Sequence, residues 1–301
     1  MTVAPGNGHI LGYRIAGIPI AVRSRAIPLL PEDDPHYVPF LAPDDLNDGA
    51  RIVVDVAEEP VVPRAGERAV LEAGDSWVLW ERGGSLVVRD RETEPGSAPG
   101  WELEILPGYA AARMTSAPWR TGAAAQAAMP SPFHYPQDQI LLTLALAGRG
   151  AVVHAGGVSL RGKGILYAGP SGAGKTTLSR LLAAAGHEIL SDDRVIVRRD
   201  AGGFALHGTP WPGEGGYAAP GVLPLAAAVF LAKGSENRLR RLAPRDLARR
   251  LLPVMSVPWF DGELAGRYLE LCEDLAARCP AFELAFRPDG GAIEALGEAL
   301  A

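Results

Sequence analysis

Short apolar, strand-like runs recur along the first third of the chain, and one of them alternates apolar and polar positions as a strand with one buried face does. Residues 101–105 place acidic side chains between apolar ones, which predicts a half-exposed strand. Gly83 and Gly84 separate two strand-like runs and indicate a β-hairpin. The strand-like runs of this region include residues 51–56, 76–80 and 86–88. The pattern predicts a β-rich N-terminal domain over residues 1–116.

From residue 136 onward, short apolar runs alternate with helical periodicity. Such alternation predicts an α/β domain, here over residues 136–301. The expected strands cover residues 151–154, 164–168, 188–191 and 282–286, and the expected helices cover residues 136–146, 177–185, 244–252, 262–277 and the C-terminal end. The residues between the two domains, 117–135, are rich in Ala, Pro and small polar types and are interpreted as a connection.

Glycine and proline interrupt this alternation between residues 201 and 224, where they make up eleven of the 24 residues. That density excludes a continuous helix and favours a loop able to approach or cover a ligand. His207, Thr209, Trp211 and Glu214 are its candidates for substrate or nucleotide contact. The alternative is a surface loop ordered by its own prolines.

Composition narrows the class of protein. The 301 residues are 48% apolar and 21% charged, as in a globular protein, and no apolar run reaches the length of a membrane span. A net charge of −6 argues against nucleic acid as the main partner. The N-terminus has no secretory pattern, so we expect a cytoplasmic location without membrane attachment, and Cys272 and Cys279 are expected to be reduced, partly buried thiols.

One motif carries the strongest chemical signal. Residues 169–176 fit the pattern G-x-x-x-x-G-K-[ST], in which backbone N–H groups converge on the phosphates of a nucleotide. A strand-like segment precedes the motif and a helical one follows, so the positive end of the helix dipole faces the phosphates. The candidate cofactor-binding residues are Gly169, Pro170, Ser171, Gly172, Ala173, Gly174, Lys175, Thr176 and Thr177. Lys175 is expected to neutralise phosphate charge, and the Thr176 hydroxyl to coordinate Mg²⁺.

Two adjacent acids, Asp192 and Asp193, follow an apolar strand soon after this loop. An acid in that position normally binds Mg²⁺ or its water shell. A pair of acids allows one to hold the metal while the other accepts a proton from an incoming hydroxyl. The alternative is that one aspartate only caps the strand or pairs with an arginine such as Arg194. Only one helix and one turn separate the pair from Lys175, which excludes the strand order of GTPases and motor ATPases.

Three segments together resemble the C-terminal domain of HPr kinase/phosphorylase, in their order and spacing: residues 154–158, 169–177 and 186–194. The resemblance implies an α/β P-loop kinase domain of the HPr kinase and phosphoenolpyruvate carboxykinase type, preceded by a smaller β-rich domain. It implies that Asp192 is the base that activates a serine hydroxyl and that Asp193 lies near the metal. It also implies that His154 sits close to the transferred phosphate; the alternative for His154 is a core histidine bonded to backbone.

Two departures from that family are visible. Its phosphate loop is usually followed by Ser-Glu, whereas this chain has Thr176-Thr177, so one metal ligand is missing. Its Gly/Arg-rich signature loop is replaced by residues 207–213. The sequence therefore resembles the broader group of HPr-kinase-related kinases, some of which phosphorylate serine in ribosomally made peptides. ATP-dependent phosphoenolpyruvate carboxykinase also contains Gly-Lys-Thr-Thr-Leu-Ser, but it is much longer and needs metal-binding segments that this chain lacks.

The sequence thus predicts a Mg²⁺- and ATP-dependent kinase that transfers the γ-phosphate to a hydroxyl, with serine of a peptide or protein as the favoured acceptor. Lys175 and the loop amides would hold the phosphates, Thr176 and Asp193 the metal, and Asp192 would be the base. A small-molecule hydroxyl kinase and a nucleotide-binding regulatory or maturation partner without transfer activity stay open as alternatives, as does a homo-oligomer. The arginine-rich residues 238–250 form either a solvated face or a contact for an acidic partner.

Overall fold

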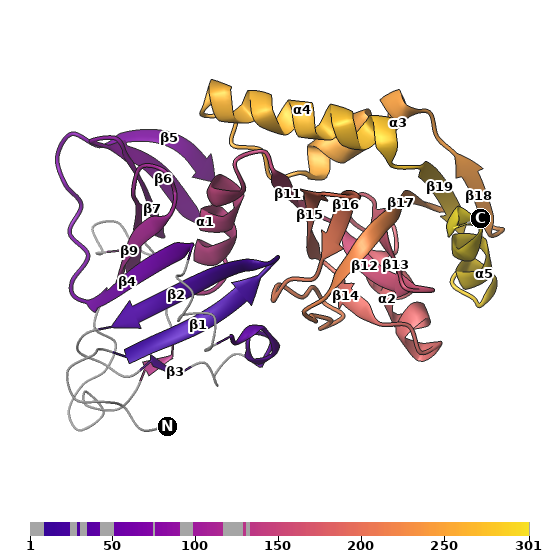
Figure 1. The fold of residues 1–301 in the computed structure, drawn as a ribbon, viewed down its shortest axis with the longest axis horizontal. Coiled ribbons are helices and arrows are strands. Elements are labelled where there is room, and N and C mark those ends of the chain that lie inside the picture. The colour runs from indigo at the N-terminus through magenta and orange to yellow at the C-terminus, as the bar shows by residue number, and fades with distance from the viewer. Residues whose placement is uncertain are drawn as a thin grey trace. The chain divides into compact units, whose positions relative to one another are not determined.

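The computed structural model describes residues 9–24, 29–30, 35–42, 51–74, 76–90, 99–116, 129–130 and 133–300. It is a mixed α/β structure with large sheets, and the chain divides into two compact units, Met1–Ala145 and Leu146–Ala301 (Figure 1). The division falls later than the domain boundary expected at residue 136, so most of helix α1 (Gln137–Leu146) belongs to the first unit. The expected connection, residues 117–135, lies mostly outside the described residues.

The described part of the first unit is built on an eight-stranded sheet in the order β1-β2-β4-β9-β8-β7-β6-β5. Strands β2, β4 and β9 run parallel, and the other neighbours are antiparallel. The strands are β1 (His9–Ile15), β2 (Ile18–Ser24), β4 (Ile52–Glu58), β5 (Arg68–Ala73), β6 (Trp77–Arg82), β7 (Ser85–Asp90), β8 (Trp101–Ile105) and β9 (Ala111–Ser116); β3 (Leu29–Leu30) pairs separately with β10 (Met129–Pro130), and a 3-10 turn, η1, covers Val38–Phe40.

The expected hairpin is present. Arg82 of β6 pairs with Ser85 of β7, so Gly83 and Gly84 form a two-residue turn. Both glycines have positive φ, 54° and 85°. A tight hairpin turn of this kind needs positive φ at both central positions, which only glycine adopts without strain.

The two faces of this sheet differ in chemistry. Directly paired positions on one face are apolar and buried, as in the row Val54, Ala112 and Ile105. One residue further along the same strands, the other face carries a row of alternating charges: Arg23, Asp55, Arg113 and Glu104. Because successive side chains of a strand point to opposite faces, one register sets both rows.

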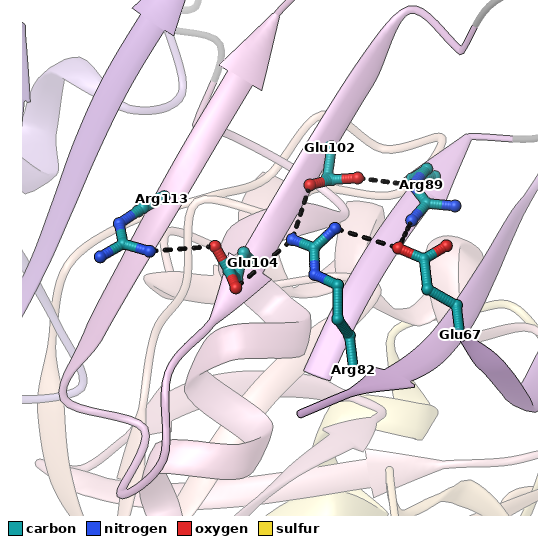
Figure 2. Close-up of polar contacts among 6 residues, drawn as sticks. All are labelled: Glu67, Arg82, Arg89, Glu102, Glu104 and Arg113. Carbon is teal, nitrogen blue, oxygen red and sulfur yellow. Dashed lines mark hydrogen bonds and ion pairs between the residues drawn. The ribbon is translucent and has the colours of Figure 1, made fainter. Parts of the chain in front are cut away.

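Arginine and glutamate side chains continue this charged face into a connected network (Figure 2). Arg82 donates to Glu67 at 3.0 Å and to Glu102 at 2.9 Å, and Arg89 donates to Glu102 at 2.6 Å and also to Glu67. Glu104 lies 3.3 Å from Arg82 and 3.3 Å from Arg113 (Figure 2). Strand β8 is present as expected, but the expectation of a half-exposed strand is wrong: Glu102 is buried, because the arginines neutralise and cover its carboxylate.

Burial and ion pairing have opposite effects on the Glu67 carboxyl. Burial disfavours its charged form, but hydrogen bonds and charge attraction from Arg89 and Arg82 outweigh that effect and lower its pKa. The network therefore stabilises the fold while Glu67 is ionised. That contribution is lost as the pH falls through the lowered pKa in the folded protein.

We expect Glu102→Ala to lower the free energy of unfolding by about 3–5 kcal/mol, because it removes a carboxylate that two buried arginines, Arg82 and Arg89, share. Arg113→Ala is the matched control: its side chain is 64% exposed, so removing its pair with Glu104 should cost no more than about 1 kcal/mol. Urea unfolding of the full chain, with amide exchange of β6–β9 as the local readout, measures both. Equal losses in the two variants would contradict this account of the network.

The second unit contains a nine-stranded sheet with the path β11-β15-β16-β17-β13-β12-β14, to which β19 is added beside β17 and β18 beside β19. Its strands are β11 (Gly150–His154), β12 (Gly156–Leu160), β13 (Lys163–Ala168), β14 (Ile189–Ser191), β15 (Arg194–Asp200), β16 (Gly203–His207), β17 (Val222–Lys233), β18 (Arg238–Arg241) and β19 (Ala281–Phe286). Strands β13, β17 and β19 are parallel neighbours, so their carboxyl ends meet at one edge of the sheet.

Helices complete the second unit: α2 (Lys175–Ala184), α3 (Pro244–Leu251), α4 (Gly262–Arg278) and α5 (Gly291–Gly297), with 3-10 turns η4 (Leu252–Val254) and η5 (Glu298–Leu300). Buried residues of α2 and α5, such as Leu178 and Leu296, share one apolar cluster with Val229 of β17. Gly186 ends the α2 region with φ of +84°, as its position predicts. Among the described residues, no helix is long and apolar enough to cross a membrane.

Several strands were not expected from the sequence. They are β12, β15, β16, β18 and the first part of β17, and β16 lies inside the segment interpreted as a loop. Glycine weakens the strand signal of β12, yet it is required there: a Cβ on Gly156 would lie 2.2 Å from the ring of Tyr167. The two cysteines are free and buried, as expected, and burial raises the pKa of Cys272 to about 11.

Candidate active site

The phosphate-loop motif lies at the carboxyl edge of the parallel strands. Strand β13 ends at Ala168, the motif follows as a turn, and α2 begins at Lys175. No side chain caps the amino end of α2. Such an uncapped helix start after a glycine-rich turn is suited to bind phosphate oxygens.

Two glycines of the loop are required by its shape. Gly174 has φ of 103°, and a Cβ there would lie 2.8 Å from the ring of Phe286 at the end of β19. A Cβ on Gly169 would lie 2.8 Å from Cβ of Ala173. The ammonium of Lys175 donates to the Gly169 carbonyl at 3.0 Å, so the side chain lies along the loop. The residues present therefore fit a nucleotide polyphosphate.

The fold brings His154 to this loop through strand pairing. His154 ends β11 and lies opposite Arg194, the first residue of β15. Its Nε2 is 3.1 Å from Oδ1 of Asp193, and Arg194 also pairs with Asp193. The charges of Asp193 and Lys175 act on one another. Lys175, Asp193 and His154, which the sequence predicts as site residues, therefore lie together.

The electrostatics of this cluster favour a charged Asp193. Burial raises the pKa of the Asp193 carboxyl. The hydrogen bond with His154 and the nearby positive charges, that of Arg194 foremost, lower this pKa by more than burial raises it, so the net shift is downward. The pKa of Lys175 is also lowered, first by burial and then by Arg194, although Asp193 opposes this. The single negative charge of Asp193 thus lies among the positive charges of Arg194 and Lys175. The excess of positive charge attracts a polyphosphate.

Asp192 lies in a different environment from its neighbour. It is 1% exposed, and its carboxylate accepts hydrogen bonds from the backbone N–H groups of Gly213 (2.8 Å), Gly215 (2.7 Å) and Tyr217 (3.3 Å). Its charge is thus directed at the loop of residues 208–221 rather than at Lys175. The adjacent aspartates do not share one environment.

Two hydroxyl residues support the corner between β14 and β15, and sequence reasoning missed one of them, Ser191. The Oγ of Ser191 donates to the Trp211 carbonyl at 3.1 Å and accepts from the N–H groups of Asp193 and Arg194, each at 3.2 Å. The hydroxyl of Thr209 donates to the Arg194 carbonyl. Both hydroxyl residues are fully buried. Thr209 had been a candidate for ligand contact, and a polar residue directly before Asp-Asp was the available signal for Ser191.

The other candidates of the Gly/Pro segment occupy different places. His207 ends β16 and is buried, and burial, followed by the charge of Arg198, lowers its pKa to about 4. Trp211 is 2% exposed, so its ring is not available to stack on a ligand. Glu214 is exposed.

In the sheet, β17 and β19 separate the arginine-bearing strand β18 from β13, the strand that leads into the glycine-rich loop. Arg240 of β18 and Arg250 of α3 both pair with Glu283 of β19, at 2.9 and 2.7 Å. The guanidinium of Arg250 also lies 5.7 Å from the centre of the Phe230 ring. These two arginines stabilise the packing of α3 and β18 on the sheet, while Arg238 and Arg241 are exposed.

A cleft of about 720 Å³ lies elsewhere, on the charged sheet face of the first unit. Its walls carry both signs of charge, including Arg23, Asp55 and Arg64, and they contain no lysine, histidine or cysteine. Among the described residues no three His, Cys, Asp or Glu side chains group as a metal site. The phosphate loop is the stronger candidate because its shape fits a definite ligand chemistry.

Comparisons with known proteins add little. No family model matches the chain, and no curated protein matches it. Among solved structures, the Hpr(Ser) kinase/phosphatase from Coxiella burnetii is similar over 50% of this chain and 87% of that chain, at 15% identity and a TM-score of 0.30. A likeness at that TM-score carries no argument about function.

Gly174→Ala should lower ATP affinity by about tenfold or more, because a left-handed backbone costs a residue with a Cβ about 1–2 kcal/mol and the methyl group would meet Phe286. Gly162→Ala is the matched control: it has φ of +73° but no atom within 4 Å of an added Cβ. It therefore carries the backbone strain alone, at the far end of β13. Calorimetric titration with ATP compares the two, and equal affinities would contradict a phosphate site at residues 169–176.

Proposed function

We propose that this chain is a Mg²⁺- and ATP-dependent kinase that transfers the γ-phosphate to a hydroxyl, with serine of a peptide or protein as the favoured acceptor. The observation that carries the proposal is the phosphate loop with Lys175 beside the paired Asp193 and His154. The choice of serine rests on the sequence resemblance to HPr-kinase-related kinases and is separate from this geometry.

Each residue of the site has a role in this proposal. The loop amides and Lys175 bind the phosphates, and Lys175 offsets the charge that grows on the β–γ bridging oxygen. His154, whose side chain is 48% exposed, is positioned to donate to a phosphoryl oxygen. Thr176 and Asp193 supply oxygen ligands of the kind that Mg²⁺ prefers, and bound Mg²⁺ would neutralise charge on the β- and γ-phosphates.

The transfer itself exchanges one phosphorus–oxygen bond for another. The acceptor oxygen bonds to the γ-phosphorus while the bond between the γ-phosphorus and the β–γ bridging oxygen breaks, so ADP leaves with that oxygen. The hydroxyl proton passes to a carboxylate. The family resemblance implies Asp192 for this role, whereas Asp193 is the carboxylate that is partly exposed and beside Lys175.

One specific observation favours the alternative of a nucleotide-binding partner without transfer activity. The carboxylate of Asp192 is occupied by three backbone donors, as in a structural aspartate. Against this alternative, Lys175, Thr176 and Asp193 together retain what phosphoryl transfer requires. Incubation with ATP labelled at the γ-position, together with serine-containing peptides, separates the two: label in peptide supports the kinase, and label in ATP alone supports the partner.

Lys175→Ala should reduce ATP turnover by about 10²–10³-fold, because it removes the cation that stabilises the developing charge. Lys163→Ala is the control, since Lys163 is an exposed lysine at the other end of β13. Release of labelled phosphate or labelled product measures the rates. Full turnover in Lys175→Ala would overturn the assignment of the site.

Asp193→Asn should keep ATP binding within a few-fold while phosphate transfer falls by about 10²-fold or more, because the amide can neither hold Mg²⁺ well nor take a proton. Glu188→Gln removes an exposed carboxylate from the same region and should change neither quantity. Equilibrium binding and transfer rates are measured on the same preparations. If Asp193→Asn transfers phosphate at the normal rate, this carboxylate has no part in the reaction.

A further inference from the structure

We propose that Asp192 is a positioning residue: its carboxylate fastens the loop of residues 208–221, and this loop in turn fixes the peptide unit of Asp193. The inference deepens the proposed function and rests on it for the activity measurements only. The hydrogen-bonded arrangement that it describes can be tested whether or not the chain transfers phosphate.

Three backbone donors surround the Asp192 carboxylate. Gly213 and Tyr217 donate to Oδ1, and Gly215 donates to Oδ2. All three come from one short stretch of the loop, more than 20 residues along the chain. A carboxylate that accepts several N–H groups of one segment holds its backbone in a single conformation, because each bond left unmade would leave a buried group without a partner.

Two glycines of the loop are shaped to this contact. A Cβ on Gly215 would lie 2.4 Å from Oδ2 of Asp192, and one on Gly213 would lie 3.1 Å from the same oxygen. Any larger residue at position 215 would force the carboxylate and the loop apart. The loop sequence and Asp192 therefore fit one another as a unit, which is the arrangement expected of a fastening and not of a group that must reach a substrate.

The fastened loop connects to Asp193 through side-chain hydroxyls. Ser191 Oγ donates a hydrogen bond to the carbonyl of Trp211, which lies within the loop. The same Ser191 oxygen accepts hydrogen bonds from the N–H groups of Asp193 and Arg194. Thr209, also within the loop, donates to the carbonyl of Arg194. The peptide units on both sides of the Asp193–Arg194 link are thus bound to the loop that Asp192 holds.

A general base needs a free lone pair directed at the acceptor hydroxyl. The two oxygens of a carboxylate offer about four acceptor positions, and three donors already use those of Asp192, which is 1% exposed. Asp193 has two side-chain partners, His154 and Arg194, and its side chain is 21% exposed, so it keeps more open acceptor positions than Asp192. The geometry therefore separates the roles: Asp193 faces the ligands, and Asp192 acts through the loop.

The test breaks the same contact from either side. Gly215→Ala displaces the loop and leaves both carboxylates chemically unchanged, whereas Asp192→Asn replaces one acceptor oxygen by a donor. Each variant should raise the exchange rates of the Gly213, Gly215 and Tyr217 amides by about tenfold or more, and those of Asp193 and Arg194 should rise as well. ATP affinity should stay within about twofold of wild type, because the phosphate loop is untouched. Gly202→Ala, where the nearest atom to an added Cβ is 3.6 Å away, is the control.

The double variant decides between fastening and base. If both substitutions break one contact, Asp192→Asn combined with Gly215→Ala should transfer phosphate within about twofold of the slower single variant. If Asp192 is the base, Asp192→Asn should lose far more transfer than Gly215→Ala, because only Asp192→Asn removes the proton acceptor; that result overturns the proposal. Unchanged exchange of the loop amides in Asp192→Asn also overturns it. If Gly215→Ala does not fold, amide exchange in Asp192→Asn alone tests the fastening. A wild-type chain without transfer activity would refute the kinase proposal, while the exchange measurements still test the fastening.

Discussion

The hydrogen bonds that Asp192 accepts from Gly213, Gly215 and Tyr217 are the interaction on which the rest of the site depends. They close a Gly/Pro-rich segment that has little conformational preference of its own. The segment then supplies the Trp211 carbonyl to Ser191, and Ser191 holds the turn that leads into β15. The buried Asp192 carboxylate thus holds this segment together with backbone bonds such as that from the Ala219 N–H to the Leu190 carbonyl.

The balance of charge around Asp193 is the second constraint. Lys175 and Arg194 are cations, His154 is a neighbour that can become one, and Asp193 is the single carboxylate that faces them. The carboxylate keeps these cations close to one another at the mouth of the loop, and the excess positive charge suits an anionic ligand. Burial lowers the pKa of Lys175, and the negative charge of Asp193 offsets part of that effect. The ammonium itself donates to the Gly169 carbonyl.

The sequence predicted the local parts of this structure well. The turn between β13 and α2, these two elements themselves, the Gly83-Gly84 turn and the end of α2 at Gly186 all follow from residues that lie next to one another. The parts it missed depend on contacts that are distant in the chain. Glu102 has the pattern of an exposed residue, and only the arginines of β6 and β7 bury it. Strand β16 has few strand-forming residues and is present because β15 and β17 pair with it on both sides. The environments of Asp192 and Asp193 also depend on contacts with residues that are distant in the chain.

The separation of Asp192 and Asp193 has a simple geometric origin. Side chains of adjacent residues in an extended or sharply bent segment point in different directions, so two consecutive carboxylates cannot both face Lys175. One of them must turn toward whatever covers the other side of the β14–β15 corner, and in this chain the cover is a loop that presents three backbone N–H groups. A motif match alone cannot say which aspartate turns which way, because that depends on whether the covering loop contains glycine where the carboxylate must approach. Gly215, whose Cβ would collide with Asp192, is therefore as informative about the role of the pair as the two acids themselves.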